Sequence, residues 1–211
     1  MSRATTSLQD GPGQHRSAAA GEVLLREADP GDSVLLLLDG HVKVTVATGR
    51  QPTAVLDFCG PGEMLGEIGA VTGRRSATVT AIGPVRCWSV PREDFHHRLA
   101  ADRSFAIEVE RRLAERLLAA ERRATSSLGA DASARVAGRL VDLAERFGVD
   151  AAGGRRIALP FSQDELAGLS GCSLESVARA LRTLRAAGWL HTGRLEMTVR
   201  DLDALRARAA V

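Results

Sequence analysis

The segment SQDELAGLSGCSLESVARALRTLRAAG, residues 162–188, contains the signals of two short helices joined by a tight turn. Ser162 and Glu165 stand three residues apart, a spacing that lets a serine and a glutamate cap a helix N-terminus reciprocally. Gly171 stands where a tight turn between helices requires a positive φ, and Ser173 can cap the helix that follows. These signals predict a helix-turn-helix over residues 162–188.

The second predicted helix has an apolar side and a charged outer face. Val177, Leu181 and Leu184 recur at helical spacing and predict the side that packs inward. The outer face carries one apolar and four charged residues: Leu174, Glu175, Arg179, Arg182 and Arg185. One interpretation is a solvated face with an ion pair between residues four apart. The cap, the turn and a following wing together favour a DNA-recognition helix instead.

The chemistry of this outer face suits DNA bases. Arginine can donate two hydrogen bonds to guanine, and glutamate can accept one from the amino group of cytosine. We therefore expect Leu174, Glu175 and Arg179 to contact bases, with the leucine against a thymine methyl group. The residues expected to contact the DNA backbone or flanking positions are Ser162, Gln163, Ser173, Arg182 and Arg185.

Two further elements surround the predicted motif. On its C-terminal side, Trp189–His191 and Leu195–Val199 flank Thr192-Gly193-Arg194 and predict a two-stranded wing. On its N-terminal side, Asp131 can cap a helix over residues 132–147. Residues 148–156 are expected to form a loop.

The N-terminal part of the chain has a different pattern. Residues 21–100 contain short apolar runs separated by turn signals, which is typical of an antiparallel β-barrel or roll. The predicted strands cover residues 34–38, 42–46, 54–58, 76–82 and 85–90. Asp39-Gly40 predicts a hairpin between the first two of them. Residues 1–20 are small, polar and interrupted by Gly and Pro, and they predict a flexible tail.

A long helix is predicted between these two parts, over residues 101–130. Its apolar residues recur every three or four positions and form a seam of Val109, Leu113, Leu117, Ala120 and Ala124. The seam predicts a homodimer; the alternative is a helix that packs against its own β-roll. The fold class is therefore α+β: an antiparallel β-roll, a dimerisation helix and a winged helix-turn-helix.

Composition excludes several kinds of protein. The formal net charge is +2 and aromatic residues make up 3%, which argues against nonspecific coating of nucleic acid and against base stacking on single strands. The three cysteines lie far apart, so no metal site or disulfide framework follows from them. No apolar run is long enough to span a membrane, and we expect a cytoplasmic protein without a membrane partner.

The whole plan resembles the cAMP receptor protein–FNR (Crp–Fnr) family of bacterial transcription regulators. The strongest marks are Gly66-Glu67 followed by Arg75-Ser76-Ala77, and Gly171-Cys172-Ser173 followed by Glu175 and Arg179. The similarity covers about residues 21–211 and leaves out the tail over 1–20. It implies a cyclic-nucleotide-binding-like roll over 21–100, a dimerisation helix over 101–130 and a winged helix-turn-helix over 131–211. It also implies a homodimer on a palindromic DNA site, with RNA polymerase as a further partner.

In members of this family that respond to cAMP, a phosphate-binding cassette spans the segment equivalent to residues 66–76. The resemblance implies that Gly66 and Glu67 contact the ribose side of a cyclic nucleotide and that Arg75 and Ser76 hold its phosphate. The alternative is a vestigial cassette in which Glu67 and Arg75 pair with each other. The two positions that contact adenine in cAMP responders carry Ala120 and Glu121 here, so another nucleotide, another small ligand or no effector stays open.

Other functions find less support in the sequence. A metal-dependent enzyme on the barrel would need several His and carboxylate ligands on neighbouring strands, but the barrel offers His41 alone. We therefore expect no enzymatic activity and no resident cofactor. A third interpretation is a DNA-binding regulator that needs no effector. For a transcription regulator whose DNA binding is controlled by an effector, we expect half-sites that contain TGA, contacted by Glu175 and Arg179.

Overall fold

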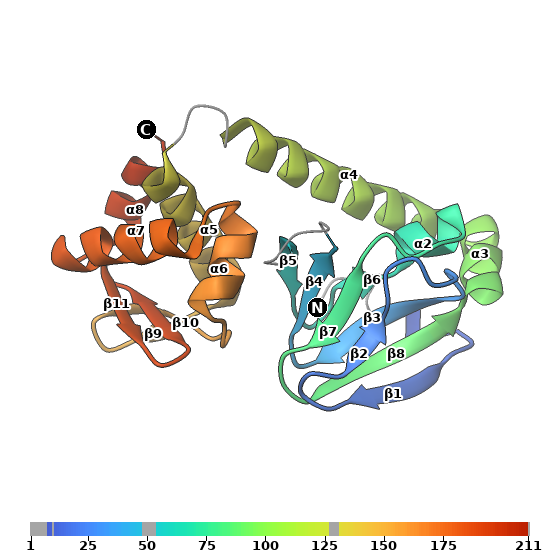
Figure 1. The fold of residues 1–211 in the computed structure, drawn as a ribbon. Helices are drawn as coiled ribbons and strands as arrows, with labels where there is room; N and C mark the ends of the chain where they lie inside the picture. The colour runs from blue at the N-terminus through green and yellow to red at the C-terminus, as the bar shows by residue number, and fades with distance from the viewer. Residues whose placement is uncertain (1–7, 10, 48–53, 127–130, 211) are drawn as a thin grey trace. The chain divides into compact units, whose positions relative to one another are not determined.

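The computed structural model describes residues 8–9, 11–47, 54–126 and 131–210, without the side chains of residues 122–126. The chain divides into two compact units, Met1–Ala119 and Ala120–Val211, which are described separately below (Figure 1).

The first unit is a roll of two four-stranded antiparallel sheets. One sheet has the order β1 (Gln14–Ala18), β8 (Val85–Pro91), β3 (Ser33–Asp39) and β6 (Met64–Leu65). The other has the order β2 (Val23–Leu25), β7 (Thr78–Ala81), β4 (Val42–Val46) and β5 (Ala54–Cys59). Leu35, Leu37, Val79 and Cys87 belong to one buried cluster of strand residues from both sheets. The predicted β-roll is therefore confirmed.

The predicted hairpin at Asp39-Gly40 is wrong. Strand β3 pairs with β6 and β8, whereas β4 pairs with β5 and β7, so this turn carries the chain from one sheet to the other. Gly40 has a φ of 80°, and a Cβ atom there would lie 2.2 Å from the carbonyl oxygen of Pro84. Close approach of another backbone segment, together with the positive φ, therefore explains the glycine.

The predicted flexible tail over residues 1–20 is also wrong for the residues that the structure describes. Residues 14–18 form edge strand β1, which pairs antiparallel with β8, and Leu8 is 1% exposed within a second apolar cluster. The segment resembles a tail because an edge strand with one exposed face needs few apolar residues. Residues 1–7 and 10 lie outside the described part of the chain.

Among the described residues, the roll is followed or covered by α2 (Glu67–Thr72), α3 (Arg92–Ala101) and α4 (Arg103–Ser126), whose residues from Ala120 onward belong to the second unit. Phe95 of α3 and Phe105 of α4 stack edge to face, with ring centroids 5.9 Å apart. Together with Val109 they form the second apolar cluster with Val34 and Leu36 of β3. Strand β3 is therefore buried on both faces, which explains its continuous apolar run.

The second unit contains four helices and a four-stranded antiparallel sheet within its described residues. The helices are α5 (Ala132–Phe147), α6 (Gln163–Ser170), α7 (Leu174–Ala186) and α8 (Leu202–Ala209). The sheet has the order β11 (Leu190–Gly193), β12 (Glu196–Val199), β10 (Gly154–Ile157) and β9 (Gly148–Ala151). The wing therefore has four strands, because the expected loop over residues 148–156 is the β9–β10 hairpin.

Among the described residues, no helix is long and apolar enough to cross a membrane. The same residues contain no group of three or more His, Cys, Asp and Glu side chains that could hold a metal ion.

Candidate functional site

Helices α6 and α7 form the predicted helix-turn-helix, and their capping signals are present as bonds. The Ser162 amide donates to Glu165 Oε2 at 2.8 Å, and the Glu165 amide donates to Ser162 Oγ at 3.1 Å. Gly171 has a φ of 59°, as the turn requires, and Ser173 Oγ accepts from the Ser176 amide at 3.2 Å. These contacts fix the N-termini of both helices.

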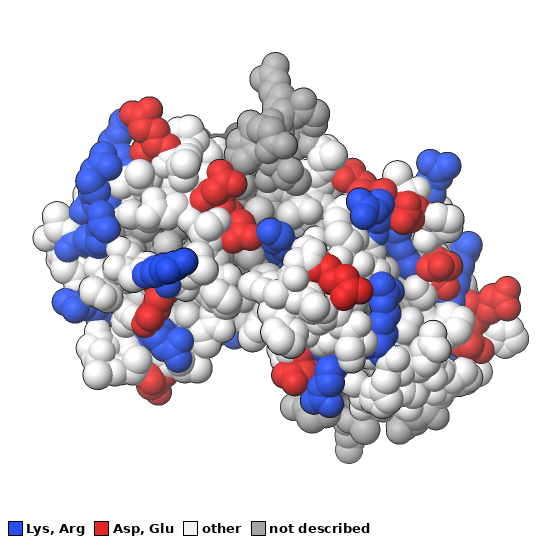
Figure 2. Space-filling view, turned by 60° about the horizontal axis from the view of Figure 1, so that its bottom comes forward, with Lys and Arg blue, Asp and Glu red and all other residues white. Residues whose placement is uncertain are grey.

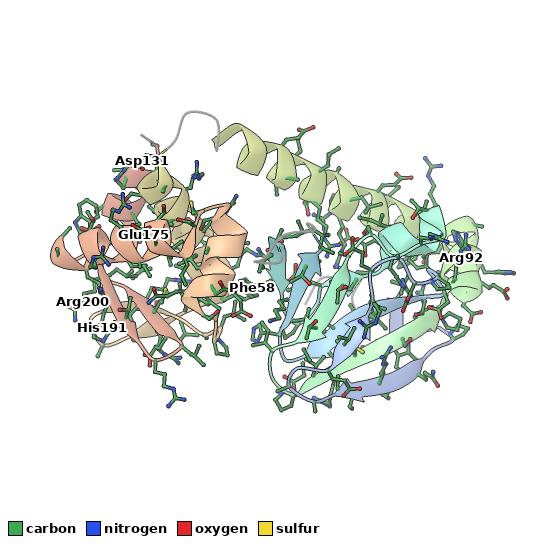
Figure 3. The ribbon with its side chains drawn as sticks, viewed as in Figure 1. Phe58, Arg92, Asp131, Glu175, His191 and Arg200 are labelled. Carbon is green, nitrogen blue, oxygen red and sulfur yellow. The ribbon has the colours of Figure 1, made fainter. Side chains whose placement is uncertain are left out.

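Helix α7 presents the predicted base-contacting residues to solvent. Leu174 is 49% exposed, and the side chains of Glu175 and Arg179 are 83% and 66% exposed. Glu175, labelled in Figure 3, accepts from Arg179 Nη2 at 3.1 Å. An exposed pair of this kind contributes only about 0.3–0.5 kcal/mol to a helix, so both groups can exchange it for contacts with bases.

The expected flanking residues lie in three places. Ser162 and Ser173 are engaged in the two helix caps, and Gln163 is exposed in the first turn of α6. Arg182 is exposed on α7. Arg185, at the end of α7, donates from Nη1 to Thr192 Oγ1 of β11 at 3.0 Å. This last bond joins the recognition helix to the wing.

Helix α5 positions the turn of the motif, a role that the sequence did not indicate. Arg135 donates from Nε and Nη2 to Cys172 Sγ at 3.4 and 3.3 Å. Arg139, one helical turn later, donates to the carbonyl oxygen of Leu169 at 3.1 Å. The four-residue spacing of the two arginines could have indicated a shared face, but their targets lie more than 29 residues away in the chain.

The face of the molecule that Figure 2 presents carries side chains of both charges. Acidic and basic side chains are interspersed on it, in keeping with the net charge of +2. Affinity for DNA must therefore come from local contacts of the kind that α7 offers.

The cassette, residues 66–76, has Arg75 at its centre. Arg75 is 5% exposed and donates from Nη1 to the carbonyl oxygens of Ser33 and Gly66 at 2.6 and 3.1 Å. Its Nη2 donates to Asp32 Oδ1 at 2.8 Å. Ser76, the next residue, is exposed. Gly66 has a φ of 86°, and a Cβ atom there would lie 2.6 Å from Arg75 Nη1, so the guanidinium packs directly on the glycine backbone.

Glu67 does not pair with Arg75, and the interpretation in which these two residues neutralise each other is wrong. Glu67 is 4% exposed, and its Oε1 accepts a hydrogen bond from Arg116 Nη1 of α4. Arg116 also donates from Nη2 to the carbonyl oxygen of Met64 at 2.7 Å. Burial alone would lower the pKa of the Arg116 guanidinium, but the Glu67 carboxylate and other nearby acidic groups raise that pKa above its usual value.

The second oxygen of Glu67 is the unusual atom of this site. Glu67 Oε2 is buried and has no hydrogen-bond partner among the described residues. An unsatisfied buried acceptor costs about 1–3 kcal/mol. A hydroxyl donor on a ligand would satisfy it, and this observation fits the ribose contact implied for a cyclic nucleotide.

Helix α4 has two sides, and the predicted dimer seam is divided between residues that pack on the roll and residues that are exposed. Val109 is buried and Leu113 is partly buried, both against the apolar cluster of the roll. Leu117 is 60% exposed, Ala120 is exposed, and the side chain of Ala124 lies outside the described residues. The alternative of packing against the chain's own roll therefore holds for the first half of the seam.

The outer side of α4 carries a different apolar group. Ile107 and Leu118 are 52% and 51% exposed, and their spacing of eleven residues places them on one line with Ala114. Glu121 is exposed one turn beyond Leu117. Arg116 of the same helix contacts the cassette, and Arg112 donates to the carbonyl oxygen of Gly62 at 2.9 Å.

Comparison with known families identifies both units. Residues 15–102 match the cyclic nucleotide-binding domain family, and residues 134–208 match the Crp-like helix-turn-helix domain family. The solved structure of FixK2 from Bradyrhizobium japonicum has a TM-score of 0.83 at 24% identity, covering 95% of this chain and 98% of that one. This likeness supports the fold.

Two relatives match most of the sequence. The chain is 30% identical over 190 residues to the CRP-like cAMP-activated global transcriptional regulator of Mycobacterium tuberculosis, covering 90% of this chain and 85% of that protein. It is 29% identical over 180 residues to the Global nitrogen regulator of Synechocystis, covering 84% of this chain and 80% of that protein.

Proposed function

Because the chain belongs to the Crp–Fnr family of transcription regulators, we propose that it acts as a homodimer on palindromic DNA with TGA-containing half-sites. The observation that carries this proposal is the exposed face of α7, where Glu175 and Arg179 stand free to exchange their mutual ion pair for bases. Its place of action would be the cytoplasm, with RNA polymerase as a partner of the bound dimer.

Leu174 sets the expected half-site. Its exposed, apolar side chain cannot donate to guanine but can contact the methyl group of thymine. Arg179 and Glu175 then recognise the one G·C pair of the central TGA, the arginine at the guanine and the glutamate at the cytosine of the complementary strand. We therefore expect a half-site such as TTGA, with a relaxed preference at the outer position.

A binding-site selection with the full chain and a randomised duplex tests this proposal. The expected result is a palindrome with two TGA half-sites separated by about one helical turn. Arg179→Ala should lower affinity about tenfold and relax one guanine position, whereas Arg103→Ala, an exposed arginine at the start of α4, should change neither. A strict TGTGA motif would overturn the role of Leu174, and no enrichment of any motif would overturn the proposed function.

We further propose that the roll binds a cyclic nucleotide as effector, with cAMP as the first candidate. Glu67 Oε2 would accept from the ribose 2′-hydroxyl, and the exposed Ser76 would donate to the phosphate. Arg75 would hold the phosphate by exchanging its bond to the exposed Asp32 carboxylate for a phosphate oxygen. The Glu67 oxygen without a partner among the described residues supports this assignment because a ribose hydroxyl is a donor that would satisfy it.

The second candidate is a regulator that needs no effector, favoured by Ala120 and Glu121 at the positions that contact adenine in cAMP responders. Calorimetry with cAMP, cGMP and 2′-deoxy-cAMP separates the two. If Glu67 binds the ribose, the deoxy analogue should bind about tenfold more weakly than cAMP. If none of these nucleotides releases heat or shifts the melting temperature, the effector-independent regulator is the better description.

A further inference from the structure

Helix α2 carries Glu67 in its first turn, and six residues are too few for a helix to be stable by its own hydrogen bonds. Its N-cap residue Gly66 has a φ of 86° and supplies no side-chain capping bond. Ile68 and Val71 are 43% and 57% exposed, so one face of the helix is open to solvent. The position of α2, and with it the position of the Glu67 carboxylate, therefore depends on contacts with neighbouring elements.

Two helices hold the two ends of α2. Arg116 of α4 donates to Glu67 in the first turn. In the last turn, His96 Nε2 of α3 lies 3.0 Å from the carbonyl oxygen of Ala70, a residue that is 0% exposed. A carbonyl oxygen can only accept, so the imidazole donates this bond and carries a proton on Nε2. Figure 1 shows α2 beside the adjoining ends of α3 and α4.

A second group competes for the same imidazole nitrogen. Arg92 Nε, one turn earlier on α3, lies 3.4 Å from His96 Nε2 and could donate to it only if that nitrogen carried no proton. Arg92, labelled in Figure 3, is exposed and can donate to water instead, whereas the Ala70 carbonyl is buried. A buried acceptor that loses its donor is costly, and a solvated guanidinium is not. The bond to Ala70 is therefore the one that the fold favours.

The carbonyl that His96 holds and the carboxylate of Glu67 belong to one rigid segment. Glu67 and Ala70 are three positions apart and lie on the same side of α2. The helix also packs closely on the loop before β3, because a Cβ atom at Gly31 would lie 1.8 Å from the carbonyl oxygen of Gly69. A displacement of about 0.5 Å takes a bond between two oxygens out of its normal range. A small shift of the last turn is therefore enough to disturb a bond made by Glu67.

We propose that His96 is a positioning residue of the effector site: its bond to Ala70 holds α2 where Glu67 Oε2 can accept from the ribose 2′-hydroxyl of a cyclic nucleotide. This inference rests on the cyclic-nucleotide binding proposed for the roll, and it requires no contact between His96 and the ligand. Arg75 is held separately, by its bond to the carbonyl oxygen of Ser33 at 2.6 Å. Loss of the His96 donor should therefore weaken the ribose contact and leave the phosphate contact in place.

The test is calorimetry of the full chain and its variants with cAMP and with 2′-deoxy-cAMP. His96→Phe removes the donor and keeps a ring beside Phe95, whose centroid lies 6.1 Å from that of the imidazole. His96→Leu is a second variant without a donor, and His96→Gln restores an amide donor. The controls are His97→Ala, at the exposed neighbouring position, and Arg92→Ala, which removes the competing donor. The melting temperature of each variant shows whether it is folded.

The wild type, both controls and His96→Gln should bind cAMP about tenfold more tightly than 2′-deoxy-cAMP. His96→Phe and His96→Leu should bind cAMP about tenfold more weakly than the wild type does and bind the deoxy analogue equally well, so that the ratio of the two affinities falls to about one. A variant that merely destabilises the roll would weaken the binding of both nucleotides.

The positioning role is overturned if both variants without a donor keep the tenfold ratio, if they weaken both nucleotides equally, or if neither of them folds. It is also overturned if Arg92→Ala reproduces the loss, because the imidazole would then act through Arg92. In each of these cases the wild type still discriminates between the nucleotides, and the proposed ribose contact of Glu67 stands. A wild type that binds both nucleotides equally would contradict that contact itself, and one that binds neither would contradict the cyclic-nucleotide effector.

Discussion

At the scale of single residues, Glu67 is the group that connects the cassette to the long helix. One of its oxygens accepts from Arg116 of α4, and the other is buried without a partner among the described residues. A ligand hydroxyl at the free oxygen would therefore act on a carboxylate whose other oxygen already holds α4. The residue can transmit a binding event without any contact between the ligand and the helix.

Removal of the Arg116 cation should destabilise the roll. Arg116→Gln leaves the Glu67 carboxylate buried without its charged partner, and we expect a loss of about 1–3 kcal/mol in the free energy of unfolding. Urea denaturation in a Trp189→Phe background measures this, because Trp88 then reports on the first unit alone. Arg111→Gln is the matched control: its half-exposed guanidinium pairs, within the described part of the chain, with Glu108 and Glu115 of its own helix, so its effect should stay within about 0.5 kcal/mol. Equal effects of both substitutions would contradict the role given to Arg116.

Asp131 should make the second unit sensitive to acid. Its carboxylate accepts from the Ala134 amide and from Arg208 of α8, and these contacts lower its pKa. A pKa that is lower in the folded state stabilises the fold above the unfolded value of about 4, and this contribution is lost as the pH falls through the folded-state pKa.

We therefore expect the free energy of unfolding of the wild type to fall between about pH 5 and pH 3, and that of Asp131→Asn to fall less steeply. The measurement is urea denaturation at several pH values in a Trp88→Phe background, where Trp189 reports on the second unit. Asp150→Asn serves as the control because the Asp150 side chain is 98% exposed. If the free energy of unfolding of Asp131→Asn falls with pH as steeply as that of the wild type and of Asp150→Asn, Asp131 is not the source of the acid sensitivity.

At the scale of elements, helix α4 carries a different apolar group on each of its two sides. Val109 and Leu113 pack on the roll, whereas Ile107 and Leu118 lie exposed on the outer side. We expect the outer side to form the dimer interface, because exposed apolar residues in line along a helix are stabilised by a second helix.

Leu118→Glu should therefore convert the dimer into a monomer at micromolar concentration and abolish binding to a palindromic site. Sedimentation equilibrium measures the first effect and electrophoretic mobility shift the second. Val109→Ala is the contrasting variant: it should lower the stability of the roll by about 1–3 kcal/mol and leave the dimer intact. A dimer that survives Leu118→Glu but dissociates with Val109→Ala would restore the seam expected from the sequence.

Elements with local signals could be predicted from the sequence, and elements without them could not. The caps at Asp131, Ser162 and Ser173 depend on neighbours three residues away, so the start of each helix follows from a short segment. Strand β1 has no comparable signal, because its partner β8 lies far away in the sequence. The β9–β10 hairpin has a local turn signal in Gly153-Gly154, but its strands GVDA and GRRI contain too few apolar residues to be distinguished from a loop. The turn at Asp39-Gly40 shows the same limit: its dipeptide specifies a bend but not which strands pair after it.

The residues of the candidate site also differ in whether a local sequence signal predicts their role. Glu175 and Arg179 could be predicted because both stand on one helix and their spacing fixes their face. Arg116 could not, because its role depends on packing against the Glu67 carboxylate, 49 residues earlier in the chain. The charge of an arginine does not reveal whether its helix face meets water or a buried acid.

At the scale of the whole molecule, an effector can control DNA binding only if its affinity differs between the DNA-bound and the free protein. Thermodynamic linkage then requires reciprocity: if cAMP raises the affinity for the palindromic site by a given factor, the site must raise the affinity for cAMP by the same factor. Calorimetry with and without DNA, and fluorescence anisotropy with and without cAMP, measure the two factors independently. We expect them to agree, at about 5–150-fold.

Because Glu67 contacts Arg116 of α4, Arg116→Gln should bring both factors toward one while a cAMP-binding signal remains. A variant that binds cAMP and keeps the full factor would show that the coupling does not pass through this pair, and a factor of one in the wild type would make the protein a regulator independent of that nucleotide.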